Sequence, residues 1–144
     1  MDIVGPKVRS RMMSNIRGQD TKPELQVRCF LHSKGFRFRL HDKRLPGRPD
    51  IVLPKYHVCI LVHGCFWHRH NDCRYATVPH TRADFWNKKF DENVKRDRET
   101  TDQLLVMGWR IITIWECGLK SRSSESLEWL PKIVQSGPAY LAWP

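Results

Sequence analysis

Histidine and cysteine gather in one short stretch of this sequence. Residues 63–73, HGCFWHRHNDC, contain three histidines and two cysteines. Thiolates and imidazoles are preferred zinc ligands, and four of them in a closed tetrahedron make a structural site. Cys65, His70 and Cys73 offer soft ligands at short spacing, and Cys117, just beyond a later apolar run, supplies a fourth. The stretch therefore predicts a structural Zn²⁺ site that ties an irregular loop to the end of a sheet.

Two alternatives stay open for these ligands. His68 or Asp72 could replace one of the four, or the thiols could be inert and buried with no metal at all. The density of ligand-type residues favours zinc. Cys29 and Cys59 lie in apolar runs and are expected in the core.

A second site is indicated by an acid at the start of an apolar run. Asp50 follows the turn sequence PGRP and precedes residues 51–53, and a third apolar run ends at Val62. Neighbouring strand ends could present the Asp50 carboxylate and the Val62 carbonyl together, and such oxygen ligands suit Mg²⁺. Alternatively, Asp50 closes the turn by accepting backbone amides. Taken alone, Asp50 favours the turn.

Four other titratable residues could reach the strand end that contains Asp50. They are Glu24, His63, His68 and Asp97. A histidine with a carboxylate partner can deprotonate a water or protonate a leaving oxygen near neutral pH. Spacing alone does not show that these groups meet, and Asp97 within KRDR would otherwise be a solvated helix acid.

Large aromatic residues interrupt the polar stretch. Phe66 and Trp67 lie in the predicted loop, and Trp86 lies at the start of a predicted helix. In a basic protein, aromatic groups beside phosphate-binding charge can wedge between base steps and unstack them. Core packing is the alternative, and this alternative is better supported for Trp86 than for Phe66 and Trp67.

The elements that must position these residues follow from patterning in the first half of the chain. Thr21 and Glu24 form a capping box that starts a helix ending near Gly35. Apolar and basic residues alternate over 36–40, which predicts a strand with one polar face. Residues 51–53 and 58–62 are apolar throughout, so they predict central strands covered on both faces.

The second half continues the same layered pattern. Thr81 and Asp84 predict the start of a helix that runs to Gly108, and residues 109–115 predict a fourth strand. Residues 127–134 predict a last helix that Pro131 shortens or bends. Helix, three strands, helix, strand and helix in this order indicate an α/β fold with a mixed sheet.

Length, charge and hydropathy restrict the class of protein. The chain has 144 residues and a formal net charge of +10, which suits one domain with a polyanionic partner. We expect a basic arm at residues 1–19, which includes Arg17, and one domain over residues 20–144. A merely soluble basic surface is the alternative. No apolar run matches a membrane span or a signal peptide.

Several motifs in order resemble the very-short-patch repair (Vsr) endonucleases. They are MSNIRGQDTKPE (Met13 to Glu24), LPGRPDIV (Leu45 to Val52), VHGCFWH (Val62 to His68), FWNKKF (Phe85 to Phe90), NVKRD (Asn93 to Asp97) and GWRIITIWEC (Gly108 to Cys117). HGCFWH combined with the distant WEC is highly specific, whereas PD at a strand start is common to many nucleases. Beyond Lys120 nothing matches.

The resemblance implies a restriction-endonuclease-like fold and a Mg²⁺-dependent endonuclease. Its substrate would be double-stranded DNA with a T:G mismatch, left by deamination of 5-methylcytosine, and it would nick one strand 5′ to the thymine. We expect a monomer in the bacterial cytoplasm, associated with the nucleoid and not with a membrane. The sequence identifies no partner repair protein.

The resemblance also assigns roles by motif. Asp50 would bind Mg²⁺ beside the Val62 carbonyl, and His68 would be the leading catalytic histidine, with His63, Asp97 and Glu24 completing the site. The implied zinc ligands are Cys65, His70, Cys73 and Cys117. The implied DNA contacts are Phe66, Trp67, Trp86, Arg17 and Lys22. Fold relatives have a second acid and a lysine where this chain has Val62 and His63. The resemblance therefore implies that a histidine performs the role that the lysine has in those relatives.

Two other functions remain compatible with the residues alone. Zinc, charge and aromatic residues would suffice for a non-catalytic DNA-binding module. A related nuclease with another nucleic-acid target would share the same motifs.

Overall fold

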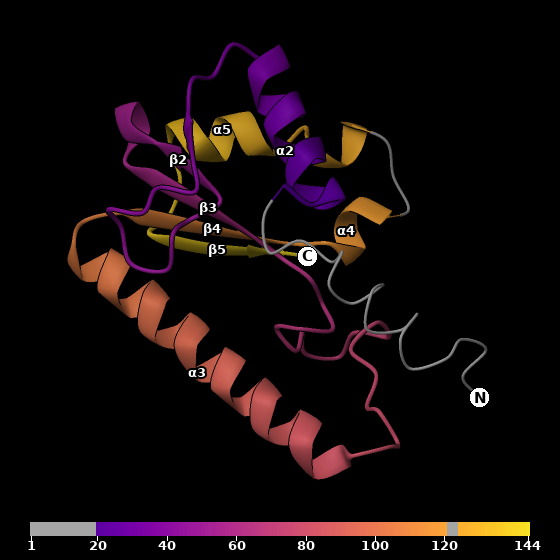
Figure 1. Ribbon diagram of the computed structural model, residues 1–144. Helices are drawn as coiled ribbons and strands as arrows, with labels where there is room; N and C mark the ends of the chain where they lie inside the picture. Colours follow the sequence, from indigo (N-terminus) through magenta and orange to yellow (C-terminus); the bar gives the residue numbers. More distant parts are fainter. Residues whose placement is uncertain (1–19, 121–123) are drawn as a thin grey trace.

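A five-stranded mixed sheet forms the centre of the computed structural model, which describes residues 20–120 and 124–144 (Figure 1). The strands are β1 (Arg39–Leu40), β2 (Ile51–Leu53), β3 (Val58–His63), β4 (Arg110–Trp115) and β5 (Tyr140–Trp143). The helices are α2 (Lys22–Ser33), α3 (Ala83–Val106), α4 (Cys117–Lys120) and α5 (Leu130–Gln135), with short 3₁₀ turns at Pro54–Tyr56 and Ser124–Leu127. The basic arm expected at residues 1–19, with Arg17, lies outside the described residues.

The strands lie in the order β1-β2-β3-β4-β5. The pairs β1/β2 and β2/β3 are antiparallel, whereas β3/β4 and β4/β5 are parallel. The expected α/β class with a mixed sheet and flanking helices is therefore confirmed. The fifth strand was not predicted.

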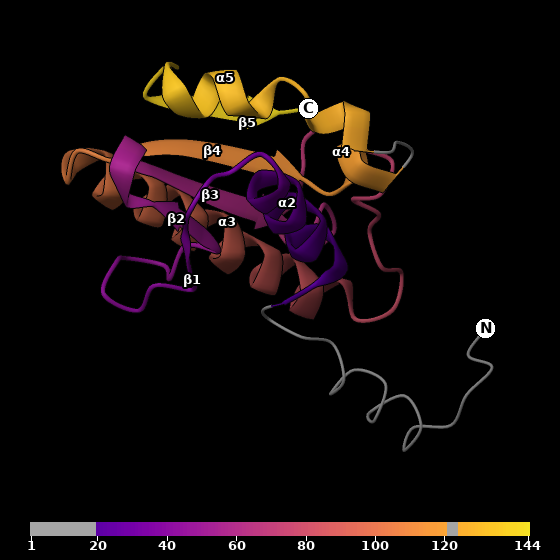
Figure 2. The same ribbon diagram turned by 90° about the horizontal axis from the view of Figure 1, so that it is seen from above.

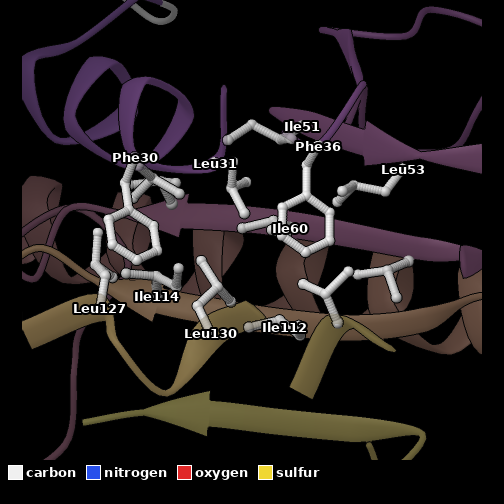
Figure 3. Close-up of a cluster of buried hydrophobic side chains, with 14 of the residues drawn as sticks. Phe30, Leu31, Phe36, Ile51, Leu53, Ile60, Ile112, Ile114, Leu127 and Leu130 are labelled. Carbon is white, nitrogen blue, oxygen red and sulfur yellow. The ribbon is translucent and has the colours of Figure 1, made fainter. Parts of the chain in front are cut away.

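Helices cover both faces of this sheet, α2 and α5 on one face and α3 on the other (Figure 2). Alternate residues of β3 point to opposite faces, as strand geometry requires. Ile60 belongs to the larger core with Leu31 and Leu130 (Figure 3). Cys59 belongs to the smaller core with Leu104 of α3. Both faces of β2 and β3 are buried, as predicted.

The start of α2 matches the predicted capping box. Thr21 Oγ1 accepts a hydrogen bond from the Glu24 amide at 3.4 Å, and Glu24 Oε2 accepts one from the Asp20 amide at 2.9 Å. Val27 is fully buried against the sheet. Cys29 is exposed, so its expected place in the core was wrong. Two helical steps of about 100° turn Cys29 away from the face that carries Val27.

Several predicted boundaries need correction. The first strand is short, because only Arg39–Leu40 pairs with β2. Helix α3 begins at Ala83 instead of Thr81, and its N-cap residue, Arg82, has a φ of 57° and no side-chain cap. Pro131 lies in the first turn of α5, where its missing N–H costs nothing, so it starts this helix instead of bending it.

The long helix α3 extends past the sheet toward the loop of residues 64–80 (Figure 1). Its buried residues are Phe90, in the projecting half, and Leu104, on the sheet. The remaining positions are largely polar. Across the part of the chain that the structure describes, none of the helices combines the length and the apolar character needed to span a membrane.

Candidate active site

A cleft of about 990 Å³ opens where β2 begins and β3 ends. Because β2 and β3 are antiparallel, the residue before β2 and the last residues of β3 lie at the same edge of the sheet. The first turn of α2 and the middle of α3 form other walls. All five residues expected to be catalytic line this cleft: Glu24, Asp50, His63, His68 and Asp97.

The Asp50 carboxylate joins two strands. Its Oδ2 accepts a hydrogen bond from the Val62 amide at 2.7 Å. The amide therefore comes from β3 and not from the turn that precedes Asp50, so the turn-closing alternative does not describe this contact. The structure thus brings Asp50 to the Val62 backbone as expected from the strand ends, but the contact is to the amide, and the role of the Val62 carbonyl stays a prediction.

The Asp50 carboxyl group is strongly perturbed. Burial raises its pKa to about 7, the Val62 amide opposes this rise, and the neighbouring Glu24 carboxylate adds to it. Ionised Asp50 is thus costly in the absence of a cation, because it is removed from water beside a second acid. A divalent ion at this carboxylate would relieve both costs.

Asp20 and His41, which were not predicted, join Glu24 and Asp50 at one side of the cleft. We call these four residues the carboxylate cluster. His41 Nε2 lies 3.4 Å from Glu24 Oε2 and 3.4 Å from Asp20 Oδ1, and His41 Nδ1 lies 4.0 Å from Asp50 Oδ1. The imidazole thus lies between three carboxylates, two from the start of α2 and one from the start of β2. A histidine shortly before the LPGRPD motif was the available signal.

His63, His68 and Asp97 form a second group in the cleft. The rings of His63 and His68 are stacked, with centroids 4.0 Å apart and planes 4° from parallel. His68 Nδ1 lies 2.6 Å from Asp97 Oδ2. This contact orients His68 and leaves its Nε2 as the nitrogen available to a substrate.

The parallel stack of His63 and His68 limits what the pair can do. A ring nitrogen directs its lone pair within its own plane, so an ion in the plane of one ring lies outside the plane of the other. The pair therefore suits proton handling better than joint metal binding. Burial, assisted by the nearby His68 and opposed by Asp97, lowers the pKa of His63 to about 3, so His63 is neutral.

The predicted soft ligands also meet. The ligand atoms of Cys65, His70, Cys73 and Cys117 all lie within 4.8 Å of one another. His70 Nδ1 is 3.7 Å from the Cys65 sulfur and 3.5 Å from the Cys117 sulfur. We call this set the Cys/His cluster, and it could hold a metal ion. His68, considered as an alternative ligand, is engaged by Asp97 instead.

Elements of the sheet support the Cys/His cluster at one side only. Cys117 begins α4 directly after β4, and the His70 ring stacks on Trp115 of β4 with centroids 4.2 Å apart. Glu116 accepts a hydrogen bond from the Cys65 amide at 3.2 Å. Cys65 follows the end of β3 after one residue, whereas His70 and Cys73 lie further along the loop of residues 64–80, which contains neither helix nor strand.

Aromatic side chains of this loop pack against the projecting half of α3. Phe66 lies 5.1 Å from Trp67 and 5.1 Å from Phe90, and Trp67 lies 5.8 Å from Trp86, between ring centroids. Phe85 is 47% exposed and contacts Trp86. We call these five residues the aromatic cluster. Phe66 and Trp67 also line the cleft, so they pack together and still face the space where DNA would lie.

Basic residues surround the cleft. Lys22 is exposed in the first turn of α2, beside the cleft residues Thr21 and Pro23. Arg48 and Arg96 line the cleft and were not predicted. Neither arginine has an acidic partner among residues 20–120 and 124–144, so both guanidinium groups are available to phosphates.

Comparison with known proteins gives a consistent set of matches. The family model described as DNA mismatch endonuclease Vsr matches residues 1–75. The chain is 45% identical to the type II nicking enzyme V.XorIIP of Xanthomonas oryzae pv. oryzae, over 82% of this chain and 86% of that protein. It is 42% identical to the DNA mismatch endonuclease Vsr of Escherichia coli K12, over 93% of this chain and 85% of that protein.

Another relative is the type II nicking enzyme V.NmeAIP of Neisseria meningitidis serogroup A. It is 43% identical over 85% of this chain and 86% of its own length. The aligned regions therefore extend well beyond the family-model match and include the elements that form the cleft.

Proposed function

The chain belongs to the family of the DNA mismatch endonuclease Vsr, and we propose on this premise that it nicks one DNA strand 5′ to the thymine of a T:G mismatch, with Mg²⁺ at Asp50. Membership makes it a hydrolytic DNA endonuclease. The mismatch, the ion and the residue roles are the proposed part. The half-buried Asp50 carboxylate, in one cleft with the His68 and Asp97 pair, carries the proposal.

Asp50 and the Val62 carbonyl would hold Mg²⁺, and the donor set fits this ion. Both ligands are hard oxygens, and the cleft leaves room for water and phosphate. When bound, Mg²⁺ would stabilise negative charge on the scissile phosphate. Glu24 lies close enough to raise the pKa of Asp50 and would add negative charge near the ion.

The histidines would handle the protons of hydrolysis. The attacking water loses a proton and the leaving oxygen gains one. His68 is suited to such a transfer because Asp97 fixes its ring at Nδ1 and leaves Nε2 free. Neutral His63, stacked on His68, would hold the orientation of that ring without adding a second positive charge.

The aromatic cluster would provide mismatch selectivity. Phe66 and Trp67 face the cleft, and Trp86 supports them from α3. Opening a base step costs least where pairing and stacking are already weak. An aromatic wedge of this kind would thus enter a T:G step more readily than a paired step. Lys22 and Arg17 would contact the phosphate backbone.

We further propose that the Cys/His cluster binds structural Zn²⁺ and that the fold is restriction-endonuclease-like. Tetrahedral zinc bonds of about 2.3 Å to sulfur and 2.0 to 2.1 Å to nitrogen place sulfur and nitrogen about 3.6 Å apart. The observed separations of 3.7 and 3.5 Å support this choice. A monomer acting on nucleoid DNA in the bacterial cytoplasm also stays a prediction.

Replacing Asp50 with asparagine tests the proposal. Asp50→Asn keeps the shape of the side chain but removes the charge, so nicking of a T:G duplex in Mg²⁺ should fall by at least about 10³-fold, while DNA binding stays within about threefold. Asp102→Asn, the same change at an exposed acid of α3, should leave nicking unchanged. A wild-type rate for Asp50→Asn would refute the metal assignment.

Substrate choice separates the remaining alternatives. The nicking enzymes among the relatives favour catalysis over a non-catalytic zinc module. A nuclease with another target would cut paired or single-stranded DNA of the same sequence as fast as the T:G duplex. We expect the T:G duplex to be nicked at least about tenfold faster than the paired one, because unstacking a mispaired step is easier.

A further inference from the structure

Arg69 lies between His68 and His70, but its side chain joins neither the histidine pair nor the Cys/His cluster. Its backbone has a φ of 55°, an uncommon conformation for a residue other than glycine. The guanidinium donates hydrogen bonds to the Thr77 and Ala76 carbonyls at 2.9 Å each and to the Phe66 carbonyl at 3.3 Å. One side chain therefore ties both ends of the segment of residues 66–77 together.

The same guanidinium also contacts the aromatic cluster. Its central carbon lies 4.1 Å from the centroid of the Phe90 ring and 5.7 Å from that of Phe66. A planar guanidinium can stack on a ring while its edges donate hydrogen bonds, which an ammonium group cannot do in the same way. Arg69 thus joins the loop that carries Phe66 to the helix that carries Phe90.

The charge of Arg69 has no acidic partner within the described ranges, 20–120 and 124–144. Carbonyl dipoles and ring faces stabilise it instead. Such an arrangement is costly to assemble unless every donor finds an acceptor. Only the forked geometry of arginine satisfies all these contacts at once.

A wedge can open DNA only if it resists being pushed back. The loop of residues 64–80 contains neither helix nor strand, but two turn hydrogen bonds bracket Phe66 and Trp67, one from the His68 amide to the Gly64 carbonyl and one from the His70 amide to the Cys65 carbonyl. The Phe66 carbonyl contacts Arg69, and the neighbouring Trp67 carbonyl accepts a hydrogen bond from Asn93 Nδ2 at 3.1 Å. The side chains of Arg69 and Asn93 therefore bind the two carbonyls that lie between these turn hydrogen bonds and add to the rigidity of the loop.

We infer that Arg69 is a positioning residue that holds the Phe66 and Trp67 wedge against α3 and thereby sets the preference for mismatched over paired DNA. The inference rests on the proposed wedge function. Arg69 is not among the residues that line the cleft, whereas Phe66 is, so Arg69 would act through Phe66. Its loss should slow the opening of the base step and leave the chemistry at Asp50 and His68 intact.

A pre-opened substrate tests this role. Single-turnover nicking is compared on three duplexes of one sequence: paired, T:G, and T:G inside a bubble of unpaired flanking bases. Arg69→Met should nick the T:G duplex about tenfold more slowly, the effect of losing charge-assisted hydrogen bonds, and the bubble less than about twofold more slowly. Steady-state kcat on the T:G duplex should fall more than KM rises.

Two further variants keep the test decisive. Arg69→Lys keeps a cation near the rings but cannot bond all three carbonyls, so its defect on the T:G duplex should be smaller and of the same sign. Arg74→Met removes the same charge from the same loop, where Arg74 is exposed and contacts Tyr75. The ratio of T:G to bubble rates should stay at the wild-type value in Arg74→Met.

The outcomes distinguish this inference from the proposed function. Equal slowing on the T:G duplex and the bubble by both Arg69 variants would overturn the positioning role, because that pattern reports general damage to the loop. An unchanged T:G rate in Arg69→Met would overturn it too. A wild-type enzyme that nicks paired and T:G duplexes equally would instead refute the proposed mismatch function.

Discussion

The carboxylate cluster and the Cys/His cluster lie at the same edge of the sheet but are built differently. Asp50 directly precedes β2, and Glu24 lies in the first turn of α2. Backbone hydrogen bonds of regular elements therefore fix both carboxylates. In the Cys/His cluster, Cys65 and Cys117 each follow a strand after one intervening residue, but His70 and Cys73 come from a loop without helix or strand.

This difference indicates that a metal ion would have a catalytic role in one cluster and a structural role in the other. In the carboxylate cluster the protein itself holds the acids together and tolerates their repulsion, so an ion supplies chemistry. In the Cys/His cluster the loop supplies His70 and Cys73 without a frame of helix or strand, so an ion would supply that frame. The following four experiments test that contrast.

The largest effect is expected from Cys117→Ala. Loss of a structural metal site belongs to the severe class of substitutions, so the free energy of unfolding should fall by more than about 4 kcal/mol. Nicking should be lost because the loop carries His68 and the aromatic wedge. Metal analysis and chemical denaturation measure this change. Cys29→Ser, at an exposed thiol, is the control. Equal stability and equal zinc content in both variants would contradict the contrast.

The next effect is a pH dependence of protein that contains zinc but no Mg²⁺. Burial raises the pKa of Asp50 to about 7 from 3.8, so between these values the folded protein binds the proton more tightly than the unfolded chain. The free energy of unfolding should therefore fall by a few kcal/mol as pH rises from about 4 to about 7, and then level off.

Chemical denaturation of the zinc-containing, Mg²⁺-free protein across this pH range measures how much Asp50 changes the free energy of unfolding. Asp50→Asn cannot ionise and should show a smaller decrease. If the two proteins show identical pH profiles, ionisation of Asp50 does not destabilise the folded protein as expected.

A smaller effect is expected at His41. Its imidazole lies between Glu24, Asp20 and Asp50, so His41→Ala leaves a buried carboxylate without this donor. We expect nicking of a T:G duplex to fall about tenfold, with KM little changed, since a lost hydrogen bond to a charge costs about 1.5 kcal/mol or more. His41→Gln retains an N–H donor and should recover most of the rate. His32→Ala, at an exposed histidine of α2, controls for the loss of a ring.

The smallest effect is expected at the cap of α2. Thr21→Ala removes the acceptor for the Glu24 amide and should lower the free energy of unfolding by about 1 kcal/mol. Thr21→Ser should keep most of this stability, and thermal denaturation compares the two. A loss in Thr21→Ala as large as that in Cys117→Ala would show that the carboxylate cluster is no better supported than the Cys/His cluster.

Much of the fold was predictable from local patterns. The Thr21 cap and the apolar runs of β2 and β3 are signals that burial and hydrogen bonding impose on nearby residues. β5 was missed because Tyr140–Trp143 is an edge strand of only four residues, so its apolar run is too short to show a period. The start of α3 was misplaced because Arg82 caps it through backbone conformation and not through a side chain.

The site was predictable where a motif marked it. Asp50, His68 and Cys65 belong to compact motifs, and the structure brings each beside its expected neighbours. His41 and Arg69 were missed because their roles arise from contacts across the fold. His41 meets Glu24, and Arg69 meets Phe90, and no periodicity in the sequence reports such a meeting.

Helix α3 is one continuous helix, but its two halves pack against different parts of the protein. Leu104 packs on the sheet, whereas Phe90 and Trp86 pack on the loop that carries the Cys/His cluster. The two halves should therefore open independently in native-state hydrogen exchange, with amides near Leu104 following global unfolding. Amides near Phe90 should lose protection when a chelator is added. One helix would then report separately on the stability of the sheet and on the occupancy of a metal site.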